Sequence, residues 1–273
     1  MRDKKELVAK SNRLVEASYR LTLVEQQIIL FAICRAREEQ KGLSAENFVS
    51  IDAQDFSDMF GTAGGGNVYS QLKEAMSRLF DRYVILYDIH PKTGKREVTK
   101  TRWISAASYI DGGGAIKLIF APLMIPYITR LEREFTAYRL EKIGKLSSVY
   151  AVRLYELLVQ YLSLGKREFE VEWIRDALDL ISEYPALKDL KKRVIDSSVK
   201  QINTHTDITT SYTQRKTGRN VTHLNFKIQA KEAPLSAPVK RPSLTRAYVE
   251  KQARAGESWE TARERLRAER KES

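Results

Sequence analysis

The chain has 273 residues, with 47 Lys and Arg against 35 Asp and Glu, so its net charge is +12 and its pI is about 9.6. A hydrophobic fraction of 42% supplies apolar surface for folded cores, which excludes a globally disordered chain. One Cys excludes disulfides and a cysteine-based zinc site. No apolar run approaches the ~20 residues of a membrane span, and the charged N-terminus indicates a cytoplasmic protein. The excess of positive charge favours a polyanionic partner.

The first half predicts helices followed by paired strands. In "RLTLVEQQ", Thr22 and Glu25 form a capping box that begins a helix, and apolar residues of helical period continue to Ile33. Beyond that helix the sequence predicts the following elements in chain order: a strand at 47–51, a short helix at 52–60, a glycine-rich turn at 61–66, a helix from Asn67 as its cap, strands at 83–89 and 98–110, a turn at 111–115, and further segments at 112–122 and 124–131.

The second half repeats much of this order. It predicts a strand at 166–172, a short helix at 173–180, a longer helix at 184–203 and a hairpin at 207–228. The hairpin tips "KTGKREVT" and "KTGRNVT" begin 124 residues apart, at Lys92 and Lys216, and the phenylalanines that open the preceding strands, Phe48 and Phe169, are 121 apart. The matched spacing indicates a duplicated module.

A helix, a turn, a second helix and a basic hairpin make up the winged form of the helix-turn-helix motif, whose second helix enters the major groove of DNA. We therefore expect an α+β protein with two tandem winged-helix domains, at 1–135 and 136–230, followed by a linker and a charged tail at 231–273. The tail is either a solvated helix interrupted at Gly256 or a disordered partner-binding segment.

The second long helix is the better candidate for reading bases. Its apolar stripe comprises Leu187, Leu190, Val194, Ile195, Val199 and Ile202. Arg193 lies near the middle of the opposite face, where a guanidinium can donate two hydrogen bonds to guanine, worth ~1–3 kcal/mol of discrimination. Between Lys188 and Lys227 there are nine basic and three acidic residues and no Glu. The DNA-binding residues that we expect in this module are Lys188, Lys192, Arg193, Lys200, Asn203, Arg215, Lys216 and Arg219.

The corresponding helix of the first module buries Val68, Leu72, Ala75, Met76, Leu79 and Tyr83 on one side. Its opposite face holds Glu74 and Asp81, which phosphates would repel, so we expect phosphate contacts here and no base reading. The residues expected to make them are Lys73, Arg78 and Arg82 on the helix and Lys92, Lys95 and Arg96 on the hairpin.

Three stretches give the chain a family resemblance: "KSNRLVEASYRLTLVEQQIIL", "LEKIGKLSSVYAVRLYELLVQY" and "EYPALKDLKKRVIDSSVKQINTHTDITTSY" with its following hairpin. With them the chain resembles the iteron-binding plasmid replication initiators, or Rep initiators, over most of 7–228. The resemblance implies two winged-helix domains in a pseudo-twofold arrangement that bind repeated origin sites, the iterons, as a monomer. It also implies a dimer, formed through the first module, that represses the protein's own promoter.

The heptad of Leu7, Leu14, Leu21 and Ile28 would suit a zipper for such a dimer. The cap at Thr22 interrupts it, which favours two separate core stripes instead. Dimerisation through other contacts of the first module stays open.

Enzyme chemistry finds little support in the sequence. The chain has three histidines, His90, His205 and His223, without the paired spacing of a metal-dependent nicking site, and "GTAGGGN" lacks the Gly-Lys-Ser/Thr of a phosphate-binding loop. We therefore expect no catalytic residues, no cofactor and no metal, and an initiator of this kind must recruit the host's replication initiator and replicative helicase. The alternatives are a winged-helix transcriptional regulator without a replication role and, with less support, an RNA-binding protein.

Overall fold

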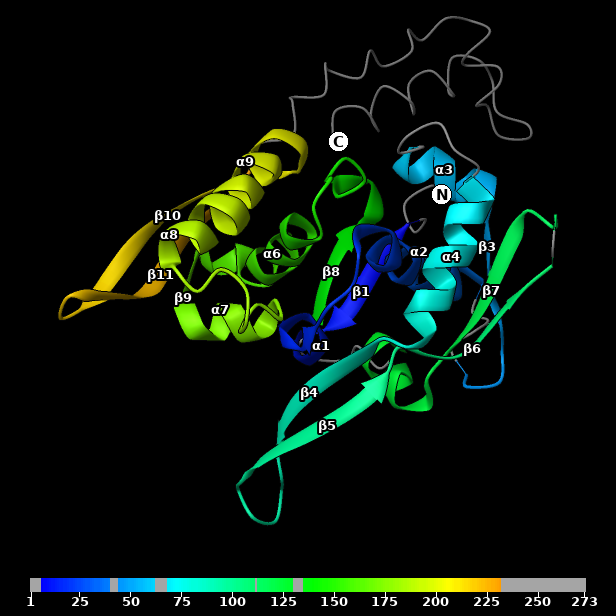
Figure 1. The fold of residues 1–273 in the computed structure, drawn as a ribbon, viewed down its shortest axis with the longest axis horizontal. Coiled ribbons are helices and arrows are strands. Elements are labelled where there is room, and N and C mark those ends of the chain that lie inside the picture. Colours follow the sequence, from blue (N-terminus) through cyan, green and yellow to red (C-terminus); the bar gives the residue numbers. More distant parts are fainter. Residues whose placement is uncertain (1–5, 40–43, 62–67, 111, 130–134, 232–273) are drawn as a thin grey trace, which may run out of the picture. The chain divides into compact units, whose positions relative to one another are not determined.

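The computed structural model describes residues 6–39, 44–61, 68–110, 112–129 and 135–231 (Figure 1). The expected tail, most of the glycine-rich turn, Asp111 of the second turn and the expected cap at Asn67 lie outside the described residues. Among the described residues, most buried apolar side chains form one continuous cluster that includes residues of both predicted modules.

The capping box at the start of the first long helix is confirmed. The backbone N–H of Thr22 donates to Glu25 Oε2 over 2.8 Å, and the N–H of Glu25 donates to Thr22 Oγ1 over 3.3 Å. The helix is buried on most of its circumference, because strands and helices pack around it. The elements from the N-terminus to this helix are β1 (Leu7–Ser11), α1 (Asn12–Glu16), β2 (Ser18–Tyr19) and α2 (Leu23–Glu39).

The zipper interpretation of the heptad is wrong. Leu7 lies on β1, Leu14 on α1 and Ile28 on α2, so the repeat is divided between a strand and two helices. Leu14, Leu21 and Ile28 are buried in the core and contribute to its packing.

The first helix-turn-helix is formed by α3 and α4. Asp52 caps α3, since its Oδ1 accepts hydrogen bonds from the N–H groups of Gln54 and Asp55 at 2.8 and 3.3 Å. Helix α4 buries Leu72, Ala75, Met76 and Leu79. The elements of this region are β3 (Val49–Asp52), α3 (Ala53–Phe60), α4 (Val68–Phe80), β4 (Tyr83–Ile89), β5 (Arg96–Arg102), β6 (Ile104–Tyr109), β7 (Ala115–Phe120), a 3₁₀ turn (Pro122–Met124) and α5 (Ile125–Thr129).

Two details of this half differ from the sequence prediction. Helix α4 ends at Phe80, and Tyr83 begins β4 with 46% of its surface exposed, so it does not extend the buried stripe. The predicted strand at 98–110 is broken at Trp103 into β5 and β6. The indole of Trp103 is fully buried edge-on against Tyr19, and there the chain passes from the sheet ordered β2-β4-β5 to the sheet ordered β3-β7-β6.

The second half contains the predicted elements in the predicted order. The long helix continues without a break through a π-helical turn. The last three strands of this half form one sheet, ordered β10-β11-β9, in which all neighbours are antiparallel. The elements are β8 (Phe135–Arg139), which pairs with β1, a 3₁₀ turn (Leu140–Lys142), α6 (Val149–Val159), a second 3₁₀ turn (Leu162–Leu164), β9 (Lys166–Glu170), α7 (Val171–Ala177), α8 (Leu187–Leu190), the π turn (Lys191–Ile195), α9 (Asp196–His205), β10 (Ile208–Thr217) and β11 (Asn220–Ala230).

The two modules share their element order but differ in strand pairing. In the second, β9 pairs with β11 of the basic hairpin, whereas in the first, β3 pairs with β7 and the basic hairpin β4–β5 pairs with β2. The match of Phe48 with Phe169 is wrong, because Phe48 precedes β3 with 46% of its surface exposed and Phe169 is 2% exposed within β9. The match of the hairpin tips holds, since Gly94 and Gly218 both have positive φ, at 65° and 62°.

Candidate nucleic-acid interface

The long helix of the second module, α8 to α9, has one buried and one basic face. Leu190, Val194, Ile195 and Ile202 are at most 1% exposed, and Leu187 and Val199 pack against the core beside them. The π turn inserts an extra residue per turn in the middle of this helix, at Lys191–Ile195, which includes Arg193. Such turns are uncommon and occur often at functional sites.

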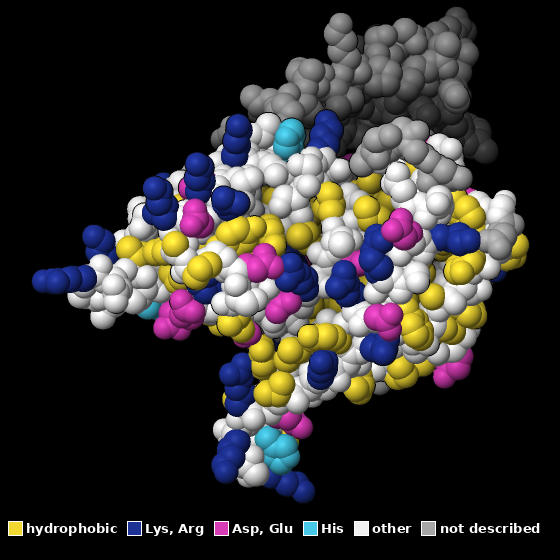
Figure 2. Space-filling view, viewed as in Figure 1, with side chains coloured by type: hydrophobic (Ala, Val, Ile, Leu, Met, Phe, Trp, Pro, Cys, Tyr) yellow, Lys and Arg dark blue, Asp and Glu magenta, His cyan; other side chains and the backbone are white. Residues whose placement is uncertain are grey.

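Four cations on the outer face of this helix are exposed and have no ionic partner in the described part of the chain. They are Lys188, Lys192, Arg193 and Lys200. The carboxylate of Asp196 lies on the same face but accepts a hydrogen bond of 2.6 Å from the hydroxyl of Tyr212. Figure 2 shows Lys and Arg side chains gathered over this helix and at the ends of both basic hairpins.

Asn203 has a structural partner. Its Nδ2 donates to the carbonyl oxygen of Thr210 over 2.8 Å, and its Oδ1 accepts from the N–H of Thr210 over 2.7 Å. The amide group thus ties the end of α9 to β10 in the way that a neighbouring strand would. Both groups of the amide are hydrogen-bonded within the protein, which assigns Asn203 a structural role.

The second hairpin presents Lys216 and Arg219 at its exposed tip. Arg215, one residue before the tip, is held differently. Its Nε and Nη2 donate to the two carboxylate oxygens of Glu168 on β9 over 2.9 and 2.7 Å. Hydrogen bonds from Arg215 hold the pKa of Glu168 at about 2, below its ordinary value. A phosphate that contacts Arg215 must therefore compete with this carboxylate.

Two arginines of the first module also have a carboxylate partner inside the protein. Glu25, of the capping box, is fully buried, and the guanidinium groups of Arg78 and Arg82 lie 3.4 and 3.0 Å from its oxygens. An unpaired buried carboxylate costs several kcal/mol, so these arginines compensate its charge and fasten the end of α4 to the start of α2. Lys73 lies over the ring of Tyr109, with its Nζ 4.4 Å from the centroid.

The first hairpin carries exposed cations at its tip and along one face. Lys92 and Lys95 lie in the tip, and the guanidinium of Arg96 stacks 3.9 Å from the centre of the Tyr87 ring. Lys100 lies on the same face, over Tyr83 at 3.6 Å, and sequence reasoning missed it. The period-two spacing of Arg96, Lys100 and Arg102 in "REVTKTR" was the available signal, because alternate residues of a strand share a face.

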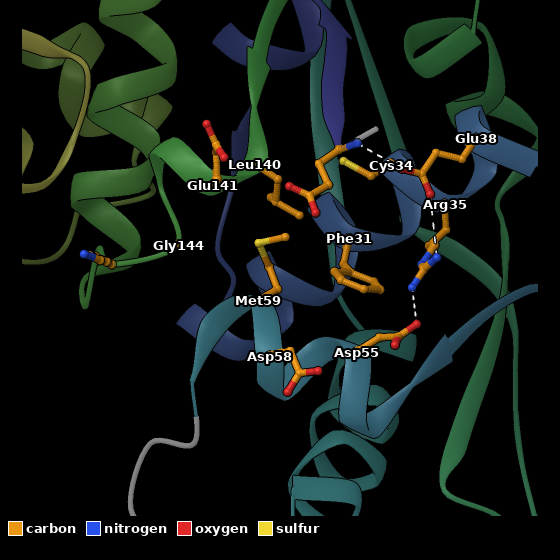
Figure 3. A pocket seen from close by; sticks show the side chains of 12 residues that line it. Phe31, Cys34, Arg35, Glu38, Asp55, Asp58, Met59, Leu140, Glu141 and Gly144 are labelled. Atoms are coloured by element: carbon orange, nitrogen blue, oxygen red, sulfur yellow. Dashed lines mark hydrogen bonds and ion pairs between the residues drawn. The ribbon is translucent and has the colours of Figure 1, made fainter. Parts of the chain in front are cut away.

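A cavity of about 580 Å³ between α2, α3 and residues 140–145 is lined mainly by acidic side chains, in contrast to the basic helix and hairpins (Figure 3). Phe31, Met59 and Leu140 line it, and Arg35 reaches between the carboxylates of Glu38 and Asp55. Five carboxylates and two cations line the cavity, which disfavours phosphate there. The lining residues are Glu6, Phe31, Cys34, Arg35, Glu38, Asp55, Asp58, Met59, Leu140, Glu141, Gly144 and Lys145.

No group of three or more potential metal ligands occurs among the described residues. In the same part of the chain, no helix is both long and apolar enough to cross a membrane.

Known proteins are similar to this chain over part or most of its length. A protein of Escherichia coli, described as an uncharacterized 27.6 kDa protein, is 26% identical over 226 residues, which are 80% of this chain and 93% of that protein. The crystal structure of Pi initiator protein in complex with iteron DNA has a TM-score of 0.70 at 21% identity, covering 85% of this chain and all of that one. The WH1 domain of a replication protein isolated from a multiple sclerosis patient is 36% identical, covers 44% of this chain and 88% of that domain, and has a TM-score of 0.35.

Family models match both winged-helix modules. Residues 7–159 match the model described as initiator replication protein, WH1, and residues 170–228 match the model described as initiator Rep protein, WH2. Together with the helix-turn-helix and hairpin of each module, these matches mean that the chain belongs to the family of initiator replication proteins with two tandem winged-helix domains.

Proposed function

We propose that this protein initiates plasmid replication by binding direct repeats, or iterons, in double-stranded origin DNA. The observation that carries the proposal is the row of exposed cations on the second module's helix, which have no ionic partner among the described residues and are flanked by the basic tip of the hairpin. The similar fold of Pi initiator protein, which was crystallised in complex with iteron DNA, supports the same partner.

The proposed contact surface assigns different roles to its cations. Arg193 reads a base in the major groove, since a guanidinium donates two parallel hydrogen bonds to guanine. Lys188, Lys192 and Lys200 contact phosphates on either side of the groove. Lys216 and Arg219 contact the backbone from the second hairpin, and Lys92, Lys95 and Arg96 do so from the first. Arg215, Arg78, Arg82 and Lys73 have partners within the protein and make weaker contributions.

The two domains have different roles in the proposed function. Residues 1–135 provide phosphate contacts and the surface through which two copies pair, and 136–230 provide the main DNA reader. As a monomer the protein occupies the repeats and recruits the host's replication initiator and replicative helicase. As a dimer it represses its own promoter. It acts in the cytoplasm, on DNA, without a cofactor of its own.

A plasmid-maintenance assay tests this function. A marker plasmid whose only replication origin is the DNA flanking the gene is introduced into a suitable host, with the protein supplied from a second, compatible replicon. We expect the marker plasmid to be maintained with the wild-type protein and with Lys117→Ala, which alters an exposed lysine of β7. The Arg193→Ala protein should fail to maintain it.

A transcriptional regulator without a replication role would give another result. The marker plasmid would be lost even with wild-type protein, while a reporter behind the gene's own promoter would still be repressed.

A further inference from the structure

The apolar core holds the first hairpin only at its base. On β4, Val84 and Leu86 are at most 1% exposed, whereas no side chain from Tyr87 to Val98 is buried. We call residues 87–98 the arm; it includes Lys92, Lys95 and Arg96. A two-stranded hairpin is marginally stable by itself, so the direction of the arm depends on contacts made where it leaves the core.

Tyr87 makes one such contact, on one face of strand β4. Its hydroxyl donates to Asp176 Oδ1 on α7 over 3.2 Å. The carbonyl oxygen of the same Asp176 accepts a hydrogen bond of 2.6 Å from Ser18 Oγ on β2, which fixes this end of α7 beside the sheet. Partial burial and the neighbouring Asp176 raise the pKa of Tyr87, so the hydroxyl remains a donor at neutral pH.

The opposite face of the strand has a second contact. Successive side chains of a strand point to opposite sides, and the carboxylate of Asp88 pairs with the guanidinium of Arg13 on α1. The arm is therefore held from both sides at two consecutive residues. Helix α7 is also the first helix of the second helix-turn-helix, so the Tyr87 contact joins the first hairpin to the reading module.

The ring of Tyr87 has a further role. The guanidinium of Arg96 stacks on it, so the residue that anchors the arm also supports one of the cations expected to meet DNA. Replacing Tyr87 by Phe keeps the ring for Arg96 and removes the hydroxyl that reaches Asp176. This substitution separates the two roles.

We propose that Tyr87 and Asp88 are positioning residues, which aim the arm at one place on the DNA relative to the reading helix of the second module. The proposal rests on the DNA-binding function proposed above. Without these contacts the cations of the arm still attract phosphate, but they meet it at several positions along the duplex. The two residues thereby restrict which spacing of contacts the protein accepts.

Tethered DNA cleavage tests this proposal directly. An iron chelate is attached to the thiol of Thr93→Cys at the tip of the arm, and in a matched protein to Thr217→Cys at the tip of the second hairpin. The native thiol of Cys34 is 3% exposed and burial raises its pKa, so it competes poorly for the reagent. Each tagged protein is bound to the site that it protects from cleavage in the DNA flanking its gene, and the width of the window cut by the tag is measured.

With the native contacts we expect the Thr93 tag to cleave a narrow window. The double substitution Tyr87→Phe with Arg13→Gln should about double its width, because the hairpin alone does not hold its direction. The window of the Thr217 tag should stay the same in both backgrounds. Asp176→Ala should broaden the Thr93 window, whereas Asp176→Asn, which keeps an acceptor oxygen for Tyr87, should not.

Two results would overturn the proposal and are distinguishable from each other. Equal Thr93 windows in all backgrounds, or no Thr93 cleavage beside a normal Thr217 window, would mean that these residues do not aim the arm. The absence of any protected site would instead remove the proposed DNA-binding function, and the positioning role with it.

Discussion

Arg153 donates a hydrogen bond of 3.1 Å from its Nη2 to the carbonyl oxygen of Ala177, the last residue of α7. The same guanidinium donates to the carbonyl oxygens of Val15 and Ala17, at the end of α1, over 2.9 and 2.8 Å. The last carbonyls of a helix lack partners within it and carry partial negative charge. One buried cation therefore caps the ends of two helices, one from each winged-helix domain.

Replacing Arg153 by Met should lower the free energy of unfolding by about 3–5 kcal/mol, because buried carbonyls of both domains lose their donor and the buried carboxylate of Glu156, 3.7 Å from the guanidinium, loses a cationic partner. Urea unfolding followed by circular dichroism measures this loss. Lys117→Met, on the exposed face of β7, should change the free energy by less than about 0.5 kcal/mol. Equal stability of Arg153→Met and wild type would mean that water or neighbouring groups replace the guanidinium.

Arg193→Ala should weaken binding to the specific site far more than binding to random duplex DNA. The difference between the two binding free energies should shrink by about 1–3 kcal/mol. Lys216→Ala and Arg219→Ala should weaken both, and each should lower the slope of binding against salt concentration by about one. Fluorescence anisotropy at several salt concentrations gives both quantities. Proportional losses on specific and random DNA for Arg193→Ala would exclude it as a base reader.

Asn203→Ala should reduce stability and leave specificity unchanged. The backbone N–H and C=O of Thr210 lose their partners, which costs about 1–3 kcal/mol for an unsatisfied buried group. The ratio of specific to non-specific affinity, measured below the unfolding transition, should match that of wild type. A reduced ratio would mean that Asn203 takes part in reading the DNA sequence.

Glu168→Gln should strengthen non-specific DNA binding, because it frees the guanidinium of Arg215 for a phosphate. The salt slope should rise by about one, as for one added phosphate contact. In the matched double variant with Arg215→Ala the gain should disappear. If Glu168→Gln binds random DNA no better than wild type, Arg215 does not reach the backbone.

The same ion pair predicts a pH effect. Because the pKa of Glu168 in the folded protein, about 2, is below its ordinary value of 4.5, the pair stabilises the fold above that ordinary value. This stabilisation is lost as the pH falls from about 4.5 to 2. Between these pH values the stability of wild type should therefore fall more steeply than that of Glu168→Gln. Parallel curves from thermal unfolding would show that solvent screens the pair completely.

The order of elements and the buried stripes were predictable because they follow from local signals. The capping box at Thr22 and the stripe from Leu187 to Ile202 each lie within one helix, where periodicity and end signals act. The strand pairing was not predictable in this way. Nothing near Trp103 in the sequence indicates that the chain changes sheets there, whereas in the fold its indole packs against Tyr19, 84 residues away.

The sequence identified most of the cations of the candidate interface. It could not show which of them have no partner within the protein and so remain available to contact DNA. The sequence shows that Arg78, Arg82 and Arg215 are basic. Only the fold shows that Glu25 lies beside the first two and Glu168 beside the third. Asn203 faces outward on a helical wheel, yet β10 lies close enough to bind its amide. Partners distant in sequence therefore decide which polar side chains remain available for DNA.

A protection footprint of the purified protein on the DNA flanking its gene, at physiological salt, decides whether the protein binds an origin. We expect several protected direct repeats of regular spacing, with protection lost for Arg193→Ala and kept for Lys117→Ala. A single protected inverted repeat, without direct repeats, would contradict origin binding and favour a transcriptional repressor.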